Sequence, residues 1–278
     1  MRQARFSFGT TVPIVGQGTW HMGENPAHRS AEVAALRHGV SLGLRLIDTA
    51  EMYAEGGAEE IVGEAIAGMR DEVFLVSKIT PHNASRAGTI AACERSLKRL
   101  KTSRIDLYLL HWPGQIPLSE TVAAFETLRE AGKIGAWGVS NFDPVDMGEL
   151  QPIRHGGNCA TNQILYNPEH RGVEFDLLGW CAGRDMPVMA YSPLGQGGRL
   201  LKSPALRAVA SRHAATTAQI ALAWALRQPN VIVIPKSATI AHVTENAAAA
   251  EIRLTAQDLA EIDKAYPPPR AARPLAML

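Results

Sequence analysis

The sequence predicts an α/β fold, a closed (β/α)8 barrel of the TIM type with an N-terminal β-hairpin and a short C-terminal tail. Short apolar runs bounded by Gly, Pro, Asn or Asp alternate with helical patterns along the chain. Such alternation is typical of parallel strands that helices cover. No change of composition marks a linker, so we expect one domain over residues 1–278. An open doubly wound sheet is the alternative.

The N-terminal segment pairs RFSF with TVPIV around GT, which predicts a hairpin that plugs the N-terminal end of the barrel. The barrel strands should follow it at regular intervals. We expect them at 14–20, 45–49, 72–79, 105–111, 136–140, 159–165, 187–192 and 231–236.

Helical periodicity fills the intervals between the strands. In 85–101, apolar residues recur at steps of three and four, from Ile90 to Leu100. The segment 119–133 has the same pattern and meets Gly132 near its end. Thr216 or Thr217 is expected to cap the helix that carries Trp224.

Composition excludes several classes of protein. Hydrophobic residues make up 46%, charged residues 20% and the net charge is +1, so no basic footprint for nucleic acid is present. No apolar stretch resembles a signal peptide or a membrane span, and we expect no membrane partner. The three cysteines lack C-x-x-C spacing and favour a reduced, cytoplasmic protein.

Each expected strand ends in a polar or aromatic residue. Because active sites of such barrels lie at the C-terminal ends of the strands, these residues should line a common mouth. They are Trp20, Asp48, Lys78, His111 with Trp112, Ser140 with Asn141, Gln163, Tyr191 with Ser192, and Lys236 with Ser237.

Several chemistries lack their sequence signature. The nine histidines are scattered without H-E-x-x-H, so we expect no metal. GVSNF at 138–142 lacks the closing glycine of a nucleophile elbow. GQGTWH at 16–21 has histidine where a dinucleotide fingerprint needs its third glycine.

Tyr53, Lys78, Asp48 and His111 together favour protonation of a developing alkoxide. A phenol titrates near pH ~10 in water, and a nearby ammonium should lower that pKa toward the working pH. Asp48 would supply the charge partner that a buried Lys78 needs. A neutral His111 would orient the substrate oxygen. Alone, each residue is equally well explained by capping, packing or a structural ion pair.

Seven motifs in order resemble the aldo-keto reductases, especially small bacterial members akin to diketogulonate reductases. The resemblance spans about residues 5–266. The motifs are DTAEMY (48–53), SKI (77–79), LLHWP (109–113), GVSNF (138–142), NQILYN (162–167), YSPLGQG (191–197) and IPKS (234–237).

The resemblance implies a monomeric barrel that reduces aldehydes or ketones with NADPH, without metal or flavin. It implies Tyr53 as proton donor, Lys78 and Asp48 as the groups that tune it, and His111 as carbonyl orienter. Trp20, Tyr53, His111 and Trp112 would contact substrate. The implied cofactor-binding residues are Thr19, Trp20, Asp48, Ser140, Asn141, Gln163, Tyr191, Ser192, Pro193, Leu194, Gly195, Gln196, Ile234, Lys236, Ser237, His242 and Asn246.

Two departures from the family pattern modify this expectation. Many relatives carry an arginine after IPKS for the 2′-phosphate, whereas ATIAHVTEN offers His242 and Thr244. We therefore expect NADPH to be used with a reduced preference over NADH. The tail PPPRAARPLAML is short, so we expect an open pocket with Trp20 and Trp112 as its walls. His21, Met22 and Phe142 are weaker candidates for its lining.

Two other functions remain open at this point. One is a nicotinamide-nucleotide-binding regulatory module with little turnover, which the complete set of four residues argues against. The other is a barrel isomerase or aldolase with Lys78 as Schiff-base amine, which leaves Tyr191 and IPKS unexplained.

Overall fold

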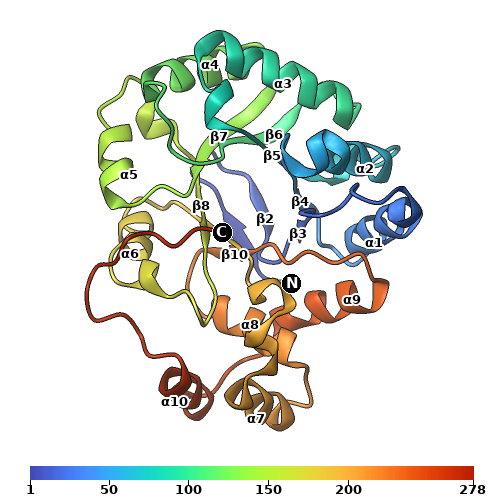
Figure 1. Cartoon of the computed structure of the whole chain (residues 1–278), viewed down its shortest axis with the longest axis vertical. Coiled ribbons are helices and arrows are strands. Elements are labelled where there is room, and N and C mark those ends of the chain that lie inside the picture. Colours follow the sequence, from blue (N-terminus) through green and yellow to red (C-terminus); the bar gives the residue numbers. More distant parts are fainter.

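The computed structural model describes all 278 residues and contains eight parallel strands ringed by helices (Figure 1). The strands neighbour one another in chain order, from β3 to β10. This order belongs to a barrel, because a doubly wound sheet reverses its order at a crevice. The strands are β3 Gln17–Gly18, β4 Leu46–Asp48, β5 Phe74–Ile79, β6 Ile105–Leu110, β7 Ile134–Ser140, β8 Asn162–Leu165, β9 Val188–Tyr191 and β10 Val231–Val233.

The first and last strands close the barrel. Val15 bridges to Val233 and Gly18 to Lys236, both in parallel register. The backbone N–H of Gly18 donates to Pro235 O at 3.0 Å. A Cβ at Gly18 would lie 2.7 Å from Ile234 O. The glycines of GQGTWH therefore allow close approach of two strands, and no phosphate loop is needed to explain them.

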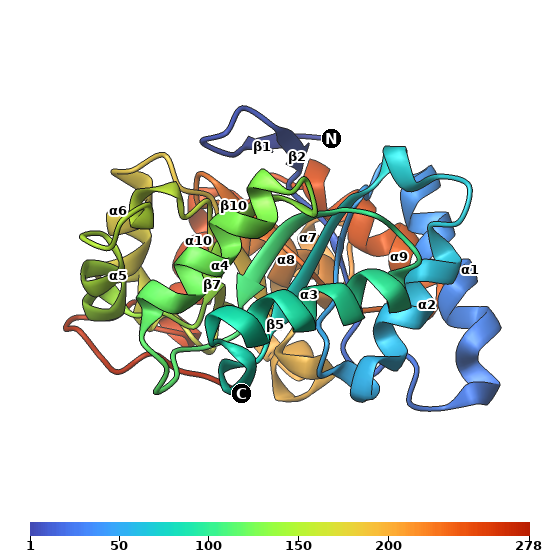
Figure 2. The ribbon, with the colours of Figure 1, turned by 90° about the horizontal axis from the view of Figure 1, so that it is seen from above.

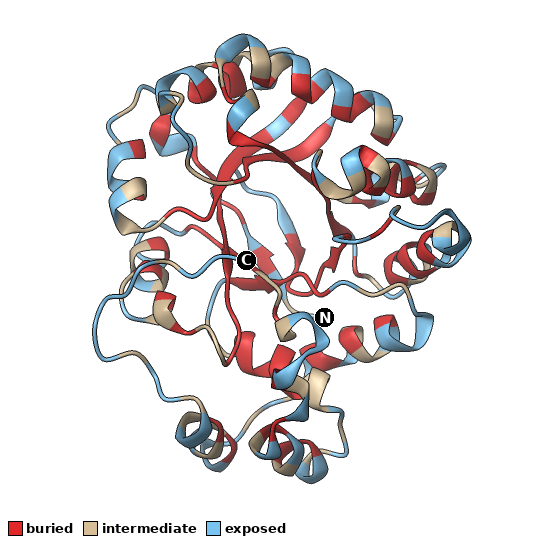
Figure 3. Cartoon of the chain, viewed as in Figure 1, coloured by how far each residue is buried: buried red, intermediate tan, exposed pale blue.

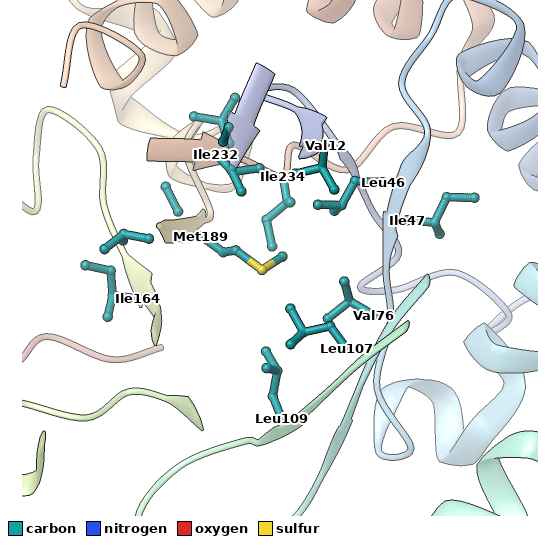
Figure 4. Packing of buried hydrophobic residues seen from close by; sticks show 14 of the residues in the cluster. Val12, Leu46, Ile47, Val76, Leu107, Leu109, Ile164, Met189, Ile232 and Ile234 are labelled. Atoms are coloured by element: carbon teal, nitrogen blue, oxygen red, sulfur yellow. The ribbon is translucent and has the colours of Figure 1, made fainter. Parts of the chain in front are cut away.

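Apolar side chains fill the barrel interior (Figure 4). Leu46, Val76, Leu109 and Met189 point toward the centre, and each is fully or almost fully buried. Ile47 lies on the opposite side of its strand from Leu46, as the alternation of a strand requires. The centre of the barrel is thus a packed core, and a ligand site can form only above or below it.

Helices cover the outside of the barrel with their buried faces toward the strands (Figure 3). The expected cap at Thr216 is present and forms a capping box with Gln219. Ser85, which was not predicted as a cap, accepts from Gly88 N through its Oγ at 3.1 Å. No helix combines the length and apolar character that crossing a membrane requires. The helices are α1 Arg29–Ser41, α2 Gly57–Ala65, α3 Arg86–Leu100, α4 Leu118–Glu130, α5 Pro144–Leu150, α6 Leu177–Ala182, α7 Pro204–Arg212, α8 Thr217–Ala225, α9 Ile240–Ala248 and α10 Ala256–Ala265.

The two ends of the chain lie at opposite ends of the barrel (Figure 2). The strands β1 (Gln3–Arg5) and β2 (Thr11–Pro13) form the expected antiparallel hairpin. The side chain of Val12 is buried beside Leu46 and Ile234 (Figure 4). The hairpin therefore closes the N-terminal end, and the strand ends with their polar residues face the other end.

The C-terminal tail runs from α10 across this other end of the barrel, and the chain ends near its centre in the view of Figure 1. Leu275 packs against the hydrophobic core. A cavity of about 670 Å³ lies between the tail and the segment from Leu165 to Leu177. The tail therefore covers one side of the mouth, which the expectation of an open mouth did not include, while Trp20 and Trp112 do not line this cavity. A proline-rich stretch of a dozen residues in extended form spans about 40 Å, which is enough to cross a barrel.

Candidate active site

Strand alternation places three of the expected catalytic side chains in the barrel mouth. Asp48, Lys78 and His111 each follow by two residues a side chain that points into the interior, namely Leu46, Val76 and Leu109 (Figure 4). Side chains two apart on a strand share a face. The three polar groups therefore sit directly above the apolar core.

The ammonium of Lys78 forms hydrogen bonds with three other residues of the site. Its Nζ donates to Asp48 Oδ2 at 2.7 Å, to Thr49 O at 2.9 Å and to Tyr53 Oη at 3.3 Å. The side chains of Lys78 and Asp48 are only 0% and 3% exposed. All three donors of the ammonium are thus used, and its charge is paired, as a buried lysine requires.

Tyr53 reaches this group from a strained loop. It begins the 3-10 segment η2 (Tyr53–Gly56), in which Ala54 and Glu55 have φ angles of 50° and 54°. Its ring stands edge-on to the ring of His111, with 5.7 Å between centroids. Left-handed backbone at non-glycine residues persists only where neighbours hold it, and it is common at active sites.

Burial governs the ionisation of this group. Burial raises the pKa of Tyr53, and the positive charge of Lys78 offsets only part of that rise. Lys78 lowers the pKa of Tyr53, as expected, but burial outweighs this effect, so the net shift is upward and not toward the working pH. Burial also raises the pKa of Asp48 against the pull of Lys78. For Lys78, burial lowers the pKa, but the attraction of Asp48 and Tyr53 together with the hydrogen bonds to both outweighs burial, and the pKa is raised.

His111 is held as a neutral imidazole. Burial and, to a lesser degree, the charge of Lys78 place its pKa well below the usual value. Its Nδ1 is buried without a partner. Its Nε2 forms no hydrogen bond and, unlike Nδ1, is not enclosed. The accessible nitrogen is thus the one available to a substrate oxygen.

Five of the expected cofactor-binding residues form one hydrogen-bonded set, in which Asn141 Nδ2 donates to Ser140 Oγ at 3.2 Å. Gln163 Nε2 donates to Asp48 Oδ1 at 2.7 Å, and Ser140 Oγ donates to Gln163 O at 2.9 Å. Asn141 accepts from Tyr191 Oη at 2.8 Å. Burial raises the pKa of Tyr191 to about 12, while the nearby backbone of Leu278 opposes this. The tail therefore ends against Tyr191.

The loop after β9 provides a cradle of backbone groups. Ser192, Gly195, Gln196 and Gly197 all have positive φ angles, of 45°, 57°, 57° and 73°. Consecutive residues of such conformation turn backbone N–H groups toward one concavity, which suits an anion. Pro193 and Leu194 lie within the same loop, and Leu194 packs against the core.

The remaining cofactor candidates are spread around β10 and α9. Lys236 and His242 are exposed, Ser237 is half-buried, and Asn246 and Ile234 are buried. Ser237 stands next to the N-terminus of α9, and its Oγ accepts from Thr239 N at 3.1 Å. The hydroxyl of Thr244 is already engaged, because it lies 2.9 Å from His38 Nε2. Of the two residues considered in place of the arginine of relatives, only His242 has a side chain without a partner.

The aromatic candidates divide into walls and core. Trp112 lies against His111, with 4.9 Å between ring centroids, and Trp20 is 39% exposed beside His21. Met22 and Phe142 are fully buried, so they support the mouth and do not line it. Thr19 is also buried, and its hydroxyl donates to Asp48 O at 3.0 Å.

Three residues near the site escaped the sequence reasoning. Glu51, inside DTAEMY, binds the loop after β5 through its carboxylate. Asn167 is fully buried and donates to Ser192 O at 2.9 Å, which fixes the start of the cradle. Glu51 and Asn167 lie within the motifs DTAEMY and NQILYN. A polar residue at a position expected to be buried is the signal by which both could have been identified. Leu278 carries no such signal in the sequence.

Comparison with known proteins identifies the kind of molecule that has this geometry. Residues 14–267 match the description "Aldo/keto reductase family". The chain is 54% identical to methylglyoxal reductase YeaE of Escherichia coli, covering 100% of this chain and 99% of that one. It is 35% identical to a glyoxal reductase of Bacillus subtilis over 92% and 89%. An aldo/keto reductase of Klebsiella pneumoniae, solved with NADP and acetate, superposes with a TM-score of 0.97 at 52% identity over 99% of both chains.

Proposed function

Since this chain belongs to the aldo/keto reductase family and is an oxidoreductase acting on carbonyl groups, we propose that it reduces small aldehydes, ketones and above all dicarbonyls with NADPH. Tyr53 is the proton donor of this proposal. The names of the two relatives, a methylglyoxal and a glyoxal reductase, favour dicarbonyl substrates. We keep the expectation that NADH also serves, because Lys236 and His242 lack the bidentate fork of an arginine.

The convergence of Lys78 on Asp48, Thr49 and Tyr53 is the observation that carries the proposal. A structural ion pair would need only Lys78 and Asp48. Here the third N–H of the ammonium donates to the phenol oxygen of Tyr53, whose ring stands next to the neutral imidazole of His111. This arrangement serves a proton transfer to an oxygen held between the phenol and the imidazole.

The mechanism follows from the protonation states. The raised pKa keeps Tyr53 protonated at neutral pH, so its proton is available to the oxygen of the substrate. His111 Nε2 donates a hydrogen bond to that oxygen and orients it. A bound nicotinamide supplies the hydride to the carbonyl carbon. When Tyr53 gives up its proton, the charge of Lys78 stabilises the phenolate, and Asp48 keeps Lys78 charged.

The residues present fit such a cofactor. Ser140, Asn141 and Gln163 are amide and hydroxyl groups gathered in the mouth, and they suit a carboxamide. The positive-φ loop from Ser192 to Gly197 suits a pyrophosphate. The N-terminus of α9, with Lys236 and Ser237 beside it, suits a further phosphate.

The test is NADPH consumption with a panel that includes methylglyoxal, glyoxal, simple aldehydes and ketones. Tyr53→Phe removes the proton but keeps the ring, and we expect turnover to fall at least ~100-fold, the usual worth of a general acid. NADPH binding, followed by fluorescence, should stay within about twofold. Tyr108→Phe is the matched control. Tyr108 lies between the inward-pointing Leu107 and Leu109 on its strand, so its side chain points away from the barrel interior. Unchanged turnover in Tyr53→Phe would remove the assignment, and a wild type that binds NADPH without turnover would favour a regulatory module.

We also propose that the protein works as a single-domain monomer in the cytoplasm. The proposed catalytic set lies within one chain, on β4, β5 and the segments that follow β4 and β6. The three cysteines are free and buried, which suits a reducing compartment. Light scattering and a single cooperative unfolding transition would test the monomer and the single domain.

A further inference from the structure

The loop that carries Tyr53 is held by a buried carboxylate with no part in the proposed reaction. Glu51 lies between Asp48 and Tyr53 in the chain, and its side chain is 9% exposed. One oxygen, Oε1, accepts from Thr80 N at 3.0 Å, from Thr80 Oγ1 at 2.9 Å and from Asn83 Nδ2 at 2.8 Å. A largely buried carboxylate costs free energy unless it is hydrogen-bonded, and Oε1 receives three hydrogen bonds here.

The charge of Glu51 has only a weak partner. Its other oxygen lies 3.8 Å from the guanidinium of Arg95, whose side chain is 51% exposed. Three neutral donors thus hold Oε1, whereas the ionic contact of Oε2 is long and open to solvent. The geometry selects Glu51 as a hydrogen-bond acceptor more than as a charge.

The contacts of Glu51 join the two segments that carry Tyr53 and Lys78. Thr80 follows Lys78 by two residues, just beyond β5. The backbone N–H of Glu51 donates to Lys78 O at 3.2 Å, so both its backbone and its side chain hold the end of this strand. Beyond Tyr53 the loop enters left-handed backbone at Ala54 and Glu55. Such strain needs an anchor on its near side.

We propose that Glu51 is a positioning residue that sets the distance from the Tyr53 hydroxyl to Lys78 and to the substrate oxygen. The inference rests on the proposed function, because it concerns the placement of the proposed proton donor. A displacement of about 1 Å at a reacting group can cost about a hundredfold in rate. Loss of the three hydrogen bonds leaves Thr80 N without its acceptor and Asn83 Nδ2 with only the longer contact to Thr80 Oγ1 at 3.4 Å, and it frees the loop to move by such a distance.

The experiment compares Glu51→Ala with Glu51→Gln. The amide oxygen of Gln can occupy the place of Oε1 and keep all three donors, so this variant should retain at least about half of the wild-type kcat. Glu51→Ala should lose about 10- to 100-fold in kcat, with NADPH affinity and carbonyl KM within about threefold. Glu60→Ala is the control, since Glu60 is half exposed and 3.9 Å from Arg29.

A double-mutant cycle with Thr80→Val tests the route of the effect. If Glu51 acts through Thr80, Glu51→Ala should have a smaller effect in the Thr80→Val background than in the wild type. Additive effects in the cycle would contradict the proposal. So would equal losses in Glu51→Ala and Glu51→Gln, or a kcat of Glu51→Ala within about twofold of wild type.

Amide hydrogen exchange of residues 49–56 gives a readout that does not need turnover. Faster exchange in Glu51→Ala, restored in Glu51→Gln, would support the anchoring role even if the wild type reduced none of the carbonyls tested. In that case only the proposed function would fail. Unchanged exchange in Glu51→Ala would overturn the inference whatever the activity.

Discussion

His111 shows how burial decides chemistry at the scale of a residue. The residue is 9% exposed, and its imidazole lies near the charge of Lys78 and has no partner for Nδ1. Each factor disfavours the protonated form, so the group is neutral across the physiological range. A neutral imidazole can donate a hydrogen bond without adding a second positive charge beside Lys78.

This lowered pKa predicts a pH dependence of stability. The unfolded chain binds a proton on His111 below about pH 6.5, while the native state does not until a much lower pH. More protons on the unfolded state mean that stability falls as the pH falls. We expect the free energy of unfolding of wild type, relative to His111→Gln, to decrease by about 1.4 kcal/mol per pH unit below about 6.5. Urea unfolding from pH 7.5 to 5 measures it, and a constant difference would contradict the lowered pKa.

The side chains that meet in the mouth could be predicted from the sequence because strand alternation and chain order fix them. Asp48, Lys78 and His111 follow apolar strand residues by two, and the barrel brings their ends together. The pKa of Tyr53 could not be predicted, because it depends on how deeply the assembled loops bury the phenol. The role of Glu51 could not be predicted either, because its hydrogen-bond partners lie about thirty residues away in the sequence.

The segment from Tyr53 into α2 shows how one element is held against the next. Glu59 of α2 is fully buried and accepts from Ser77 Oγ and from Arg99 Nε, both at 2.6 Å. Gly56 has a φ of +97°, and a Cβ there would lie 2.5 Å from Arg99 Cδ. Gly56 therefore leaves the room that Arg99 needs to reach Glu59.

This crowding predicts an effect of Gly56→Ala on stability. We expect the free energy of unfolding to fall by roughly 1–3 kcal/mol more than in Gly68→Ala, through overpacking against Arg99. Gly68 has a φ of +84° with no atom within 4 Å of an added Cβ, so it reports the backbone cost alone. Denaturant unfolding of both variants gives the difference, and equal losses would show that Arg99 adapts freely.

Element positions were largely predictable because apolar runs and caps are local signals. Seven of the eight strands fall inside their expected ranges, and β7 begins earlier, at Ile134. Isolated 3-10 turns such as η2 could not be predicted, because Ala54 and Glu55 adopt left-handed backbone that their side chains do not favour. Tertiary contacts impose that conformation.

At the scale of the whole molecule, the packed core and the polar groups of the proposed site lie in different parts of the barrel. The hairpin and the apolar interior close one end, and the strand ends carry polar groups at the other (Figures 2 and 4). The path of the tail was not predictable, because prolines and small residues give no periodic signal. Its position depends on single contacts such as that of Leu275 with the core.

The tail predicts a selectivity change on truncation. Deleting residues 270–278 removes the end of the C-terminal tail but leaves α10 and the hydrogen bond from Arg171 to Tyr266 O intact. We expect the ratio of kcat/KM for bulky aldehydes to that for methylglyoxal to rise about tenfold, since one or two apolar contacts are worth 1–3 kcal/mol. Thermal melting should change little. An unchanged ratio would mean that the tail does not limit entry.

The opposed termini have a practical consequence for handling the protein. Leu278 ends against Tyr191, so a fusion partner or affinity handle joined there would stand at the entrance of the site. Met1 lies at the far end, beside the hairpin. Attachment through the N-terminus, to a column or to a sensor surface, would leave the entrance facing the solution.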